Sequence, residues 1–236
     1  MNRKVPSNRN SKIPRNVPAT KPTKSQALAQ SKQVNVNAQA RVKKNILLSI
    51  LIPSVPDRNA QMIDVYKTLQ KQILPRFKEN VEIITFVDNR QRTTGKKRND
   101  LINLSQGKYV VFVDDDDKVD STYVRSILDV ICTEPDVDCI VFDVLYRRMV
   151  DGFEKIARYS KDMTYRNDLN VFHRKPNHLM CFRREIALKV PYPNTSRGED
   201  TKWGELVCPL IKKQARVDKV LYTYEYREKP ISHFAK

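Results

Sequence analysis

The sequence predicts an α/β protein with a mostly parallel central sheet and helices on both of its faces. Two observations support this fold class. Short apolar runs alternate along the chain with segments of helical period, in the order strand, helix, strand, helix, strand. The runs are rich in Val and Ile and nearly free of polar residues, which is typical of parallel strands covered on both faces. Right-handed crossovers between such strands place helices on both sides of the sheet.

Residues 1–44 differ from the rest of the 236-residue chain. They hold eleven Lys/Arg and no Asp or Glu, within a total net charge of +17. They also lack aromatic residues and a sustained apolar period, so they cannot bury enough surface to offset the entropy cost of ordering. We therefore expect a disordered basic tail over 1–44 and one folded domain over 45–236. The tail's charge would attract nucleic acid or another anionic surface, although a solubilising extension fits its composition equally well.

The composition also bears on location. No apolar stretch approaches the roughly 18 residues of a membrane-spanning helix, and no secretory signal is visible. The four cysteines lie in apolar contexts without C-x-x-C spacing, which favours buried free thiols in a reducing compartment. We expect a soluble cytoplasmic protein with no transmembrane segment, and peripheral membrane association stays open.

Three predicted strands in the first half of the chain each end at a polar turn. The first, Ile46–Pro53, closes at a proline turn that includes Ser54. The second, Val81–Val87, leads directly into Asp88, and the third, Tyr109–Val113, leads into four consecutive aspartates. Because ligand sites of open α/β sheets lie at the carboxyl ends of the strands, these turns are expected to share one site.

The remaining helices and strands are predicted from helical spacing of apolar residues and from short apolar runs. Helices are expected where apolar residues recur every three or four positions, at residues 59–74, 96–105, 121–132 and from 199 onwards. Further strands are expected at 139–146, 177–185 and 221–227, with a hairpin that turns at Asp151-Gly152.

The aspartate run Asp114–Asp117 carries the strongest chemical signal. Four adjacent carboxylates repel one another, so a folded chain that keeps them is expected to give them a cation. Oxygen ligands suit Mn²⁺ or Mg²⁺ carrying a nucleotide's phosphates. A solvated acidic turn that caps the next helix is the alternative for the run alone. The five glycines form no G-x-G-x-x-G or Walker loop, so the metal and basic side chains would have to hold any phosphates.

Several motifs in order resemble the family 2 glycosyltransferases of GT-A fold, over about residues 45–233. The matching segments are Ile52-Pro53-Ser54, Asp88, Gly95 through Arg98-Asn99, the DXD-containing strand Gly107–Asp117 and the later pair Glu199-Asp200. The family's first strand typically ends I-P-x-Y-N-R. This chain departs from it at Val55-Pro56-Asp57, and again at Lys97, where a small residue is usual.

The resemblance implies roles for the matching residues at the donor. Asp88 would hydrogen-bond uracil or a comparable base, Arg98 would contact the nucleotide, and Asp114 would bind ribose or the metal. The full donor-binding set is Pro53, Ser54, Asp88, Arg98, Asp114 and Asp115. Asp116 would coordinate a cation that bridges the diphosphate, with Asp117 in support, because a diphosphate leaves readily only when its growing charge is offset.

At the acceptor side, the resemblance makes Asp200 the general base that deprotonates the attacking hydroxyl, with Glu199 orienting the sugar or the acceptor. Acids in a first helical turn are also ordinary capping chemistry. Five further residues have two readings each. Lys97 would hold phosphates or lie on a solvated helix face, His178 and Trp203 would touch substrate or belong to the core, and Arg227 and His233 would reach the diphosphate or metal or lie near a frayed end.

The function implied by the resemblance is an inverting, metal-dependent transfer from a nucleotide-diphospho-sugar, foremost a UDP-sugar, to a hydroxyl group. The acceptor would be a glycan, a protein or a hydroxylated nucleobase in DNA. A nucleic-acid-binding protein with an inactive GT-A-like domain is the main alternative. A nucleotidyltransferase of related fold is another, although its usual Gly-rich loop is absent.

Overall fold

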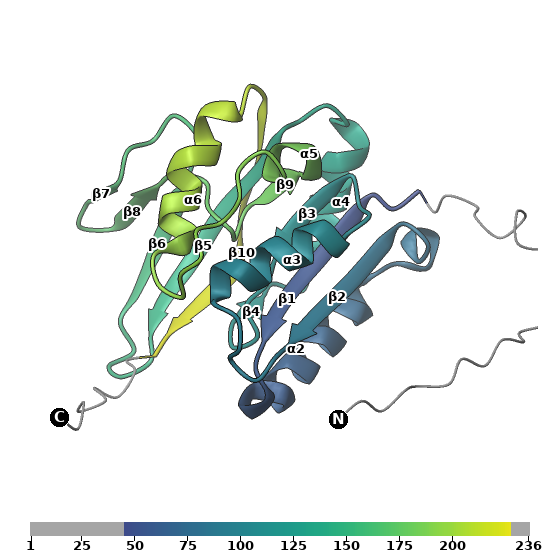
Figure 1. The fold of residues 1–236 in the computed structure, drawn as a ribbon. Helices are drawn as coiled ribbons and strands as arrows, with labels where there is room; N and C mark the ends of the chain where they lie inside the picture. Colours follow the sequence, from purple (N-terminus) through teal and green to yellow (C-terminus); the bar gives the residue numbers. More distant parts are fainter. Residues whose placement is uncertain (1–44, 228–236) are drawn as a thin grey trace, which may run out of the picture. The chain divides into compact units, whose positions relative to one another are not determined.

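The computed structural model describes residues 45–227 (Figure 1). The predicted basic tail and His233 lie outside these residues. No helix within residues 45–227 has both the length and the apolar character that crossing a membrane requires.

The three strands predicted in the first half form a parallel sheet. Strand β1 (Leu48–Ser54) lies between β2 (Val81–Val87) and β3 (Tyr109–Phe112) and pairs in parallel with both. All seven residues of β1 are buried, because helices cover both faces of the sheet here. This burial accounts for the unbroken apolar sequence of β1.

Helices cover both faces of the sheet, as the sequence predicts. Helix α2 (Asn59–Gln72) and helix α4 (Tyr123–Thr133) pack together on one face, and α3 (Thr94–Leu104) and α6 (Glu199–Val207) lie on the other (Figure 1). Helix α4 illustrates this arrangement: five of its residues recur at helical spacing and are buried, Tyr123, Val124, Ile127, Leu128 and Ile131, while its other side faces solvent.

The second half makes the sheet a mixed one. The hairpin of β5 (Cys139–Arg148) and β6 (Glu154–Tyr159) is antiparallel, as predicted. The expected strand at 177–185 is shorter, since only β9 (Cys181–Arg183) pairs, antiparallel to both β3 and β5, before the chain turns into a short helix. The remaining elements are β4 (Lys118–Val119), β7 (Arg166–Asn167), β8 (Val171–Arg174), α5 (Arg184–Ala187) and three 3₁₀ turns at Pro56–Arg58, Pro75–Phe77 and Cys208–Leu210.

Strand β10 (Gln214–Tyr226) is longer than the closing strand that the sequence predicts, and it connects two parts of the sheet. It pairs in parallel with β5 along most of its length. Near its end it also pairs antiparallel with β4, where Tyr222 stands opposite Val119. Because β4 directly follows the aspartate run, β10 brings its own side chains next to those acids.

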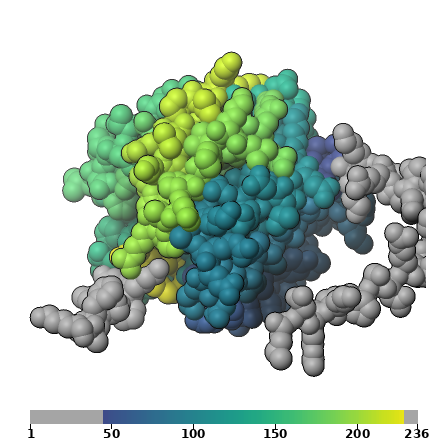
Figure 2. Space-filling view, in the orientation of Figure 1, coloured from purple at the N-terminus to yellow at the C-terminus, as the bar shows by residue number. Residues whose placement is uncertain are grey.

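Helix α3 lies against the loop that precedes α6, and the space-filling view shows the two segments in continuous contact (Figure 2). The Gly95 amide donates to the carbonyl of Thr195 at 3.0 Å. A Cβ on Gly95 would lie 1.9 Å from the Pro193 oxygen, so only glycine fits. The Asn99 side chain donates to the Tyr192 carbonyl and accepts from its amide, at 2.9 and 2.8 Å. The Gly95–Asn99 motif therefore fixes this loop.

The cysteine prediction is confirmed for three residues and wrong for one. Cys139, Cys181 and Cys208 are buried free thiols, whereas Cys132 is exposed. Cys132 lies in the last turn of α4, next to the buried Ile131 but turned toward solvent.

Candidate active site

Most of the predicted catalytic, donor-binding and metal-binding residues line one cavity of about 790 Å³ on the carboxyl side of β1 and β3; Ser54, Asp88 and Asp117 do not. Its walls come from the turn after β1, the start of α3, the aspartate run, the start of α6 and the end of β10. The lining residues are Pro53, Arg58, Thr94, Lys97, Arg98, Asp114, Asp115, Asp116, Ser196, Arg197, Gly198, Glu199, Asp200, Tyr224, Glu225, Tyr226 and Arg227. Asp116 and Asp200, which are far apart in the sequence, thus face the same space.

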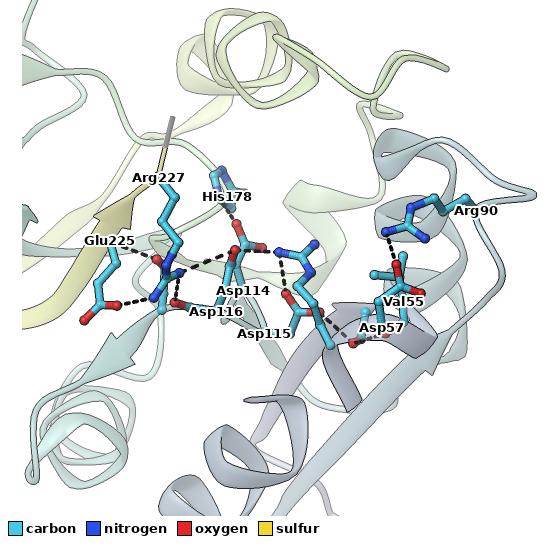
Figure 3. A network of polar contacts seen from close by, with 12 residues as sticks. Val55, Asp57, Arg90, Asp114, Asp115, Asp116, His178, Glu225 and Arg227 are labelled. Carbon is cyan, nitrogen blue, oxygen red and sulfur yellow. Dashed lines mark hydrogen bonds and ion pairs between the residues drawn. The ribbon is translucent and has the colours of Figure 1, made fainter. Parts of the chain in front are cut away.

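Asp114 is held between two basic side chains (Figure 3). Its Oδ1 accepts from Arg98 Nη2 at 2.9 Å, and its Oδ2 lies 3.3 Å from His178 Nε2. Burial opposes the charge of Asp114, but Arg98 and His178 outweigh burial and hold the pKa of this carboxyl well below its ordinary value. Asp114 is therefore a fixed anion in the wall of the cavity.

Asp115 points into the interior beneath the first turn. Its Oδ2 accepts a hydrogen bond from Ser54 Oγ at 2.6 Å, and its Oδ1 lies 3.1 Å from Arg58 Nη1. Burial raises the pKa of Asp115 to about 6, against the lowering effects of Ser54 and Arg58. Ser54 therefore positions an aspartate, and its hydroxyl is occupied within the protein.

Asp116 is the carboxylate of the run that is most available to a ligand. Its side chain is 31% exposed, compared with 1% for Asp115 and 22% for Asp114. Its Oδ2 lies 2.5 Å from Arg58 Nη1 and 3.7 Å from Arg227 Nη1 (Figure 3). The Arg227 guanidinium also donates to the backbone carbonyl of Asp116 at 3.0 Å.

Asp117 is buried and turned toward β10. It accepts hydrogen bonds from Tyr222 Oη at 2.8 Å and from the Glu225 amide at 2.9 Å. Burial and the nearby Asp114 charge raise the pKa of Asp117 well above its ordinary value. These contacts tie the aspartate run to the last strand, a role that the sequence did not indicate.

Asp88, at the end of β2, is paired with Lys97. Asp88 Oδ1 lies 2.8 Å from Lys97 Nζ, and its Oδ2 accepts from the Arg92 amide at 2.8 Å. Lys97 Nζ also donates to the Ser54 carbonyl at 2.9 Å and the residue is buried, so the predicted alternative of a solvated helix face is wrong. Asp88 does not line the large cavity. Its contact with a base stays a prediction.

The first turn of α6 closes the cavity opposite the aspartate run. Gly198 precedes it with φ of +70°, a left-handed conformation that favours glycine and turns the chain into the helix. Glu199 is buried 3.6 Å from Arg98 Nε, and Asp200 is partly exposed. His178 lies between the two acidic groups of the cavity, 3.3 Å from Asp114 and 3.5 Å from Asp200.

A family comparison agrees with this geometry. Residues 56–190 match the family model described as Glycosyl transferase family 2. That segment is more than half of the chain and contains the aspartate run. The chain belongs to glycosyl transferase family 2. Curated protein sequences give no match to it.

Solved structures share the GT-A fold of this family 2 protein. S. aureus TarS 1–349 has a TM-score of 0.56 at 16% identity, with 76% of this chain and 60% of that chain covered. The same TarS fragment in complex with UDP-GlcNAc has a TM-score of 0.54 at 13% identity, with coverage of 78% and 60%. The chain thus spans 60% of the length of these structures.

The structure locates Trp203 and His178, which were each predicted either to contact substrate or to belong to the core of this family 2 domain. Trp203 is buried, stacks on Tyr192 with ring centroids 4.5 Å apart, and donates its indole N–H to the Val190 carbonyl. It is a core residue and lines none of the cavities described here. His178 is buried as well, but its two ring nitrogens face Asp114 and Asp200. His178 therefore belongs to the site region.

Three residues that organise the site were missed in the sequence. Arg58 contacts two aspartates, yet it stands one residue beyond the arginine of the family's I-P-x-Y-N-R pattern. Tyr222 and Glu225 hold Asp117 from more than 100 positions away. The Tyr-rich strand β10 was visible in the sequence, but no local pattern reveals which of its side chains reaches an acid.

Proposed function

We propose that this family 2 protein is an inverting glycosyltransferase that moves a sugar from a UDP-sugar to an acceptor hydroxyl. The observation that carries the proposal is the cavity that Asp116 and Asp200 share. The proposed metal-binding acid and the proposed general base would need to reach the same bound donor, and the shared cavity supports this. The UDP-GlcNAc complex of TarS, which shares the fold, supports a UDP-sugar as the donor.

The carboxylates of the aspartate run fit Mn²⁺ or Mg²⁺. Within residues 45–227 no three His, Cys, Asp or Glu side chains are arranged to hold a metal by themselves. Mg²⁺ commonly binds through one or two carboxylates together with substrate phosphates, and hard oxygen ligands suit Mn²⁺ in the same way. Asp116, with Asp114 beside it, supplies such ligands. When bound, the cation would offset the charge that grows on the departing diphosphate.

The basic side chains of the cavity would hold the nucleotide and its phosphates. Arg58 and Arg227 both pair with the Asp116 carboxylate. A cation bound to that carboxylate would free the two guanidinium groups to bind phosphate oxygens. The buried Arg98 guanidinium donates from Nη2 to Asp114, and its Nε lies 3.6 Å from Glu199, so it holds both acids in the wall of the cavity. Pro53 contributes the apolar wall at the end of β1.

The transfer step would take place between the two acidic walls. As the acceptor oxygen bonds to the anomeric carbon, the bond from that carbon to the diphosphate oxygen breaks. The hydroxyl proton passes to Asp200, and the nucleoside diphosphate leaves. A single displacement of this kind inverts the anomeric configuration. Glu199 is buried against Arg98 and is suited to orienting groups rather than to accepting the proton.

Donor binding tests the proposal. Calorimetric titration of the protein with UDP should give binding in Mn²⁺ that EDTA abolishes, and Asp116→Ala should weaken it by about tenfold or more. The control Asp129→Ala removes an exposed acid on α4 and should change nothing. UDP binding that is insensitive to both Mn²⁺ and Asp116→Ala would contradict the metal assignment. Complete absence of UDP-sugar binding would contradict the function.

A further inference from the structure

A second cavity, of about 380 Å³, lies on the other side of Asp200 from the donor cavity. The two cavities share Asp200 and Tyr224, so these side chains form the wall between them. The other lining residues are Val144, Tyr146, Ala157, Tyr159, Asn167, Phe172, Arg174, Asn177 and Leu179. A molecule in this second cavity would have direct access to the carboxylate that we propose as the base.

Aromatic rings from four strands line the cavity. Tyr146 of β5 packs edge-on against Phe172 of β8, with ring centroids 5.6 Å apart and an interplanar angle of 81°. It also contacts Tyr224 of β10 at 5.9 Å. Ring faces carry partial negative charge, which attracts the weakly positive C–H groups of a sugar ring. The side chains of Asn167 and Asn177, together with Asp200, supply hydrogen-bonding groups for hydroxyls.

Arg174 adds a positive charge to this wall. Its Nη1 donates to the carbonyls of Arg166 and His173 at 3.2 and 2.8 Å, and its guanidinium lies 4.8 Å from the Phe172 ring centroid. Within residues 45–227 it forms no ion pair with an acid. One edge of the guanidinium is therefore anchored, while Nε and Nη2 keep their donors for a ligand. A planar fork of this kind suits a carboxylate or a phosphate.

The cavity continues past Arg174. A third cavity, also of about 380 Å³, shares Asn167 and Arg174 with the second and is otherwise lined by Tyr165, Arg166 and Thr201. The path from the donor cavity therefore runs past Asp200, over the aromatic rings, and along Arg174 to the surface. Such a path suits an extended chain of sugar units better than a single small molecule.

We propose that the second cavity binds the acceptor, and that the acceptor is a glycan carrying an anionic group, a carboxylate or a phosphate, that Arg174 recognises. This rests on the proposed function, since it places the attacking hydroxyl at Asp200. The Tyr146 ring meets Phe172 at 81° and Tyr224 at 42°, so these rings form no pair of parallel walls. A flipped nucleobase is gripped by stacking between side chains, so the geometry favours a sugar ring over a base.

Binding of defined probes tests the proposal. Saturation-transfer NMR would follow a glucuronate-containing tetrasaccharide, glucose 6-phosphate, neutral maltotetraose and a hydroxymethylcytosine oligonucleotide, each with and without UDP and Mn²⁺. We expect at least one of the two anionic sugars to bind, and the better of them identifies the anionic group. Arg174→Gln should weaken binding of the anionic sugar about tenfold and leave the affinity for neutral maltotetraose unchanged. Phe172→Ala should weaken binding of the anionic sugar and of maltotetraose alike.

Arg158→Gln is the matched control. Arg158 lies on β6, paired with His173 of the neighbouring strand β8. Its side chain lies near Asp143 and lines a separate surface hollow. The control should bind all probes like the unmodified protein, and UDP affinity should be equal in all variants. Binding of UDP but of neither anionic sugar, or anionic binding untouched by Arg174→Gln, overturns the acceptor assignment, as does binding of the oligonucleotide alone. Anionic sugar binding without any UDP binding contradicts the proposed function instead.

Discussion

Four adjacent aspartates have four different surroundings in this protein. Asp114 is fixed by Arg98 and His178, Asp115 by Ser54, and Asp117 by Tyr222. Asp116 is the most exposed of the four, and both of its basic partners, Arg58 and Arg227, line the same cavity. The mutual repulsion that the sequence implies is thus relieved mainly by neighbouring donors, and the proposed cation would serve Asp116 rather than all four carboxylates.

In the proposed mechanism, the chemistry depends most on Asp200. Replacing it by Asn keeps the size and the contact with His178 but removes the proton acceptor, so Asp200→Asn should lower sugar transfer by about 100-fold or more. UDP affinity should stay the same, because Asp116 and the arginines are untouched. The measurement is product formation by mass spectrometry beside UDP calorimetry. Full transfer activity in this variant would disprove the assignment of the base.

The buried pair of Asp88 and Lys97 makes a stability prediction with a defined pH dependence. Burial opposes the charge of Asp88, yet Lys97 and the Arg92 amide outweigh it and lower the pKa of Asp88. A lowered pKa stabilises the fold above the ordinary value near 4 and loses that effect as pH falls through the folded value. Asp88→Asn should therefore cost about 2 kcal/mol of unfolding free energy at pH 7 and much less near pH 3.

Urea unfolding of both proteins at the two pH values measures this difference. Asp57→Asn is the control, since Asp57 pairs with Arg90 at an exposed position and should leave stability nearly unchanged. A deficit of Asp88→Asn that stays constant between pH 7 and pH 3 would show that the ion pair is not its source.

At the scale of elements, helix α3 positions the site through its close approach to the loop before α6. Gly95→Ala would place a methyl group 1.9 Å from the Pro193 oxygen and push the two segments apart. Since α3 also carries Arg98, we expect both a lower melting temperature and weaker UDP binding. Gly152→Ala should lower only the melting temperature, because Gly152 has a φ of +72°, a left-handed conformation that strains alanine, and does not line the cavity. Unchanged UDP affinity in Gly95→Ala would contradict this.

The sequence predicts the elements near the acids well, because each has a clear local period. Strand β2 and the four central helices lie close to where apolar spacing places them. The strand expected at 177–185 is shorter than predicted because pairing is decided by neighbours, and only Cys181–Arg183 meets β3 and β5. The mixed direction of the second half of the sheet has the same cause, since no local pattern states which strands become partners.

For the site as well, local sequence motifs predict part of the arrangement, and contacts between distant residues decide the rest. Motif order identifies many of the residues that line the cavity, because the carboxyl ends of parallel strands meet there, although Ser54, Asp88 and Asp117 do not line it. It does not reveal which oxygen of which acid is already occupied by a neighbour. Ser54 and Lys97 were expected near the donor, but both bind other protein groups. The Ser54 hydroxyl donates to Asp115, and Lys97 pairs with Asp88 and donates to the Ser54 carbonyl. Such contacts depend on side-chain packing across the fold, and sequence spacing does not encode them.

For the whole molecule, charge is divided unevenly between residues 1–44 and the folded domain. The tail's eleven basic residues and absent acids predict salt-dependent retention on DNA, which deletion of residues 1–44 should remove. UDP binding should survive the deletion, since every residue of the cavity lies between Pro53 and Arg227. Retention on a DNA column at low and moderate salt, beside UDP calorimetry, measures both. Equal retention after deletion would place the DNA-binding charge on the domain.

Strand β10 has a consequence for how the protein is made. It is the last strand of residues 45–227 to leave the ribosome, yet Tyr222 and the Glu225 amide hold Asp117, and Arg227 lies on Asp116. A nascent chain that ends before Gln214 contains all four aspartates and both α6 acids but lacks the residues of β10 and Arg227 that hold Asp116 and Asp117. Newly synthesised protein should consequently gain its nucleotide affinity in one late event, after translation has passed residue 227, rather than gradually as the domain emerges.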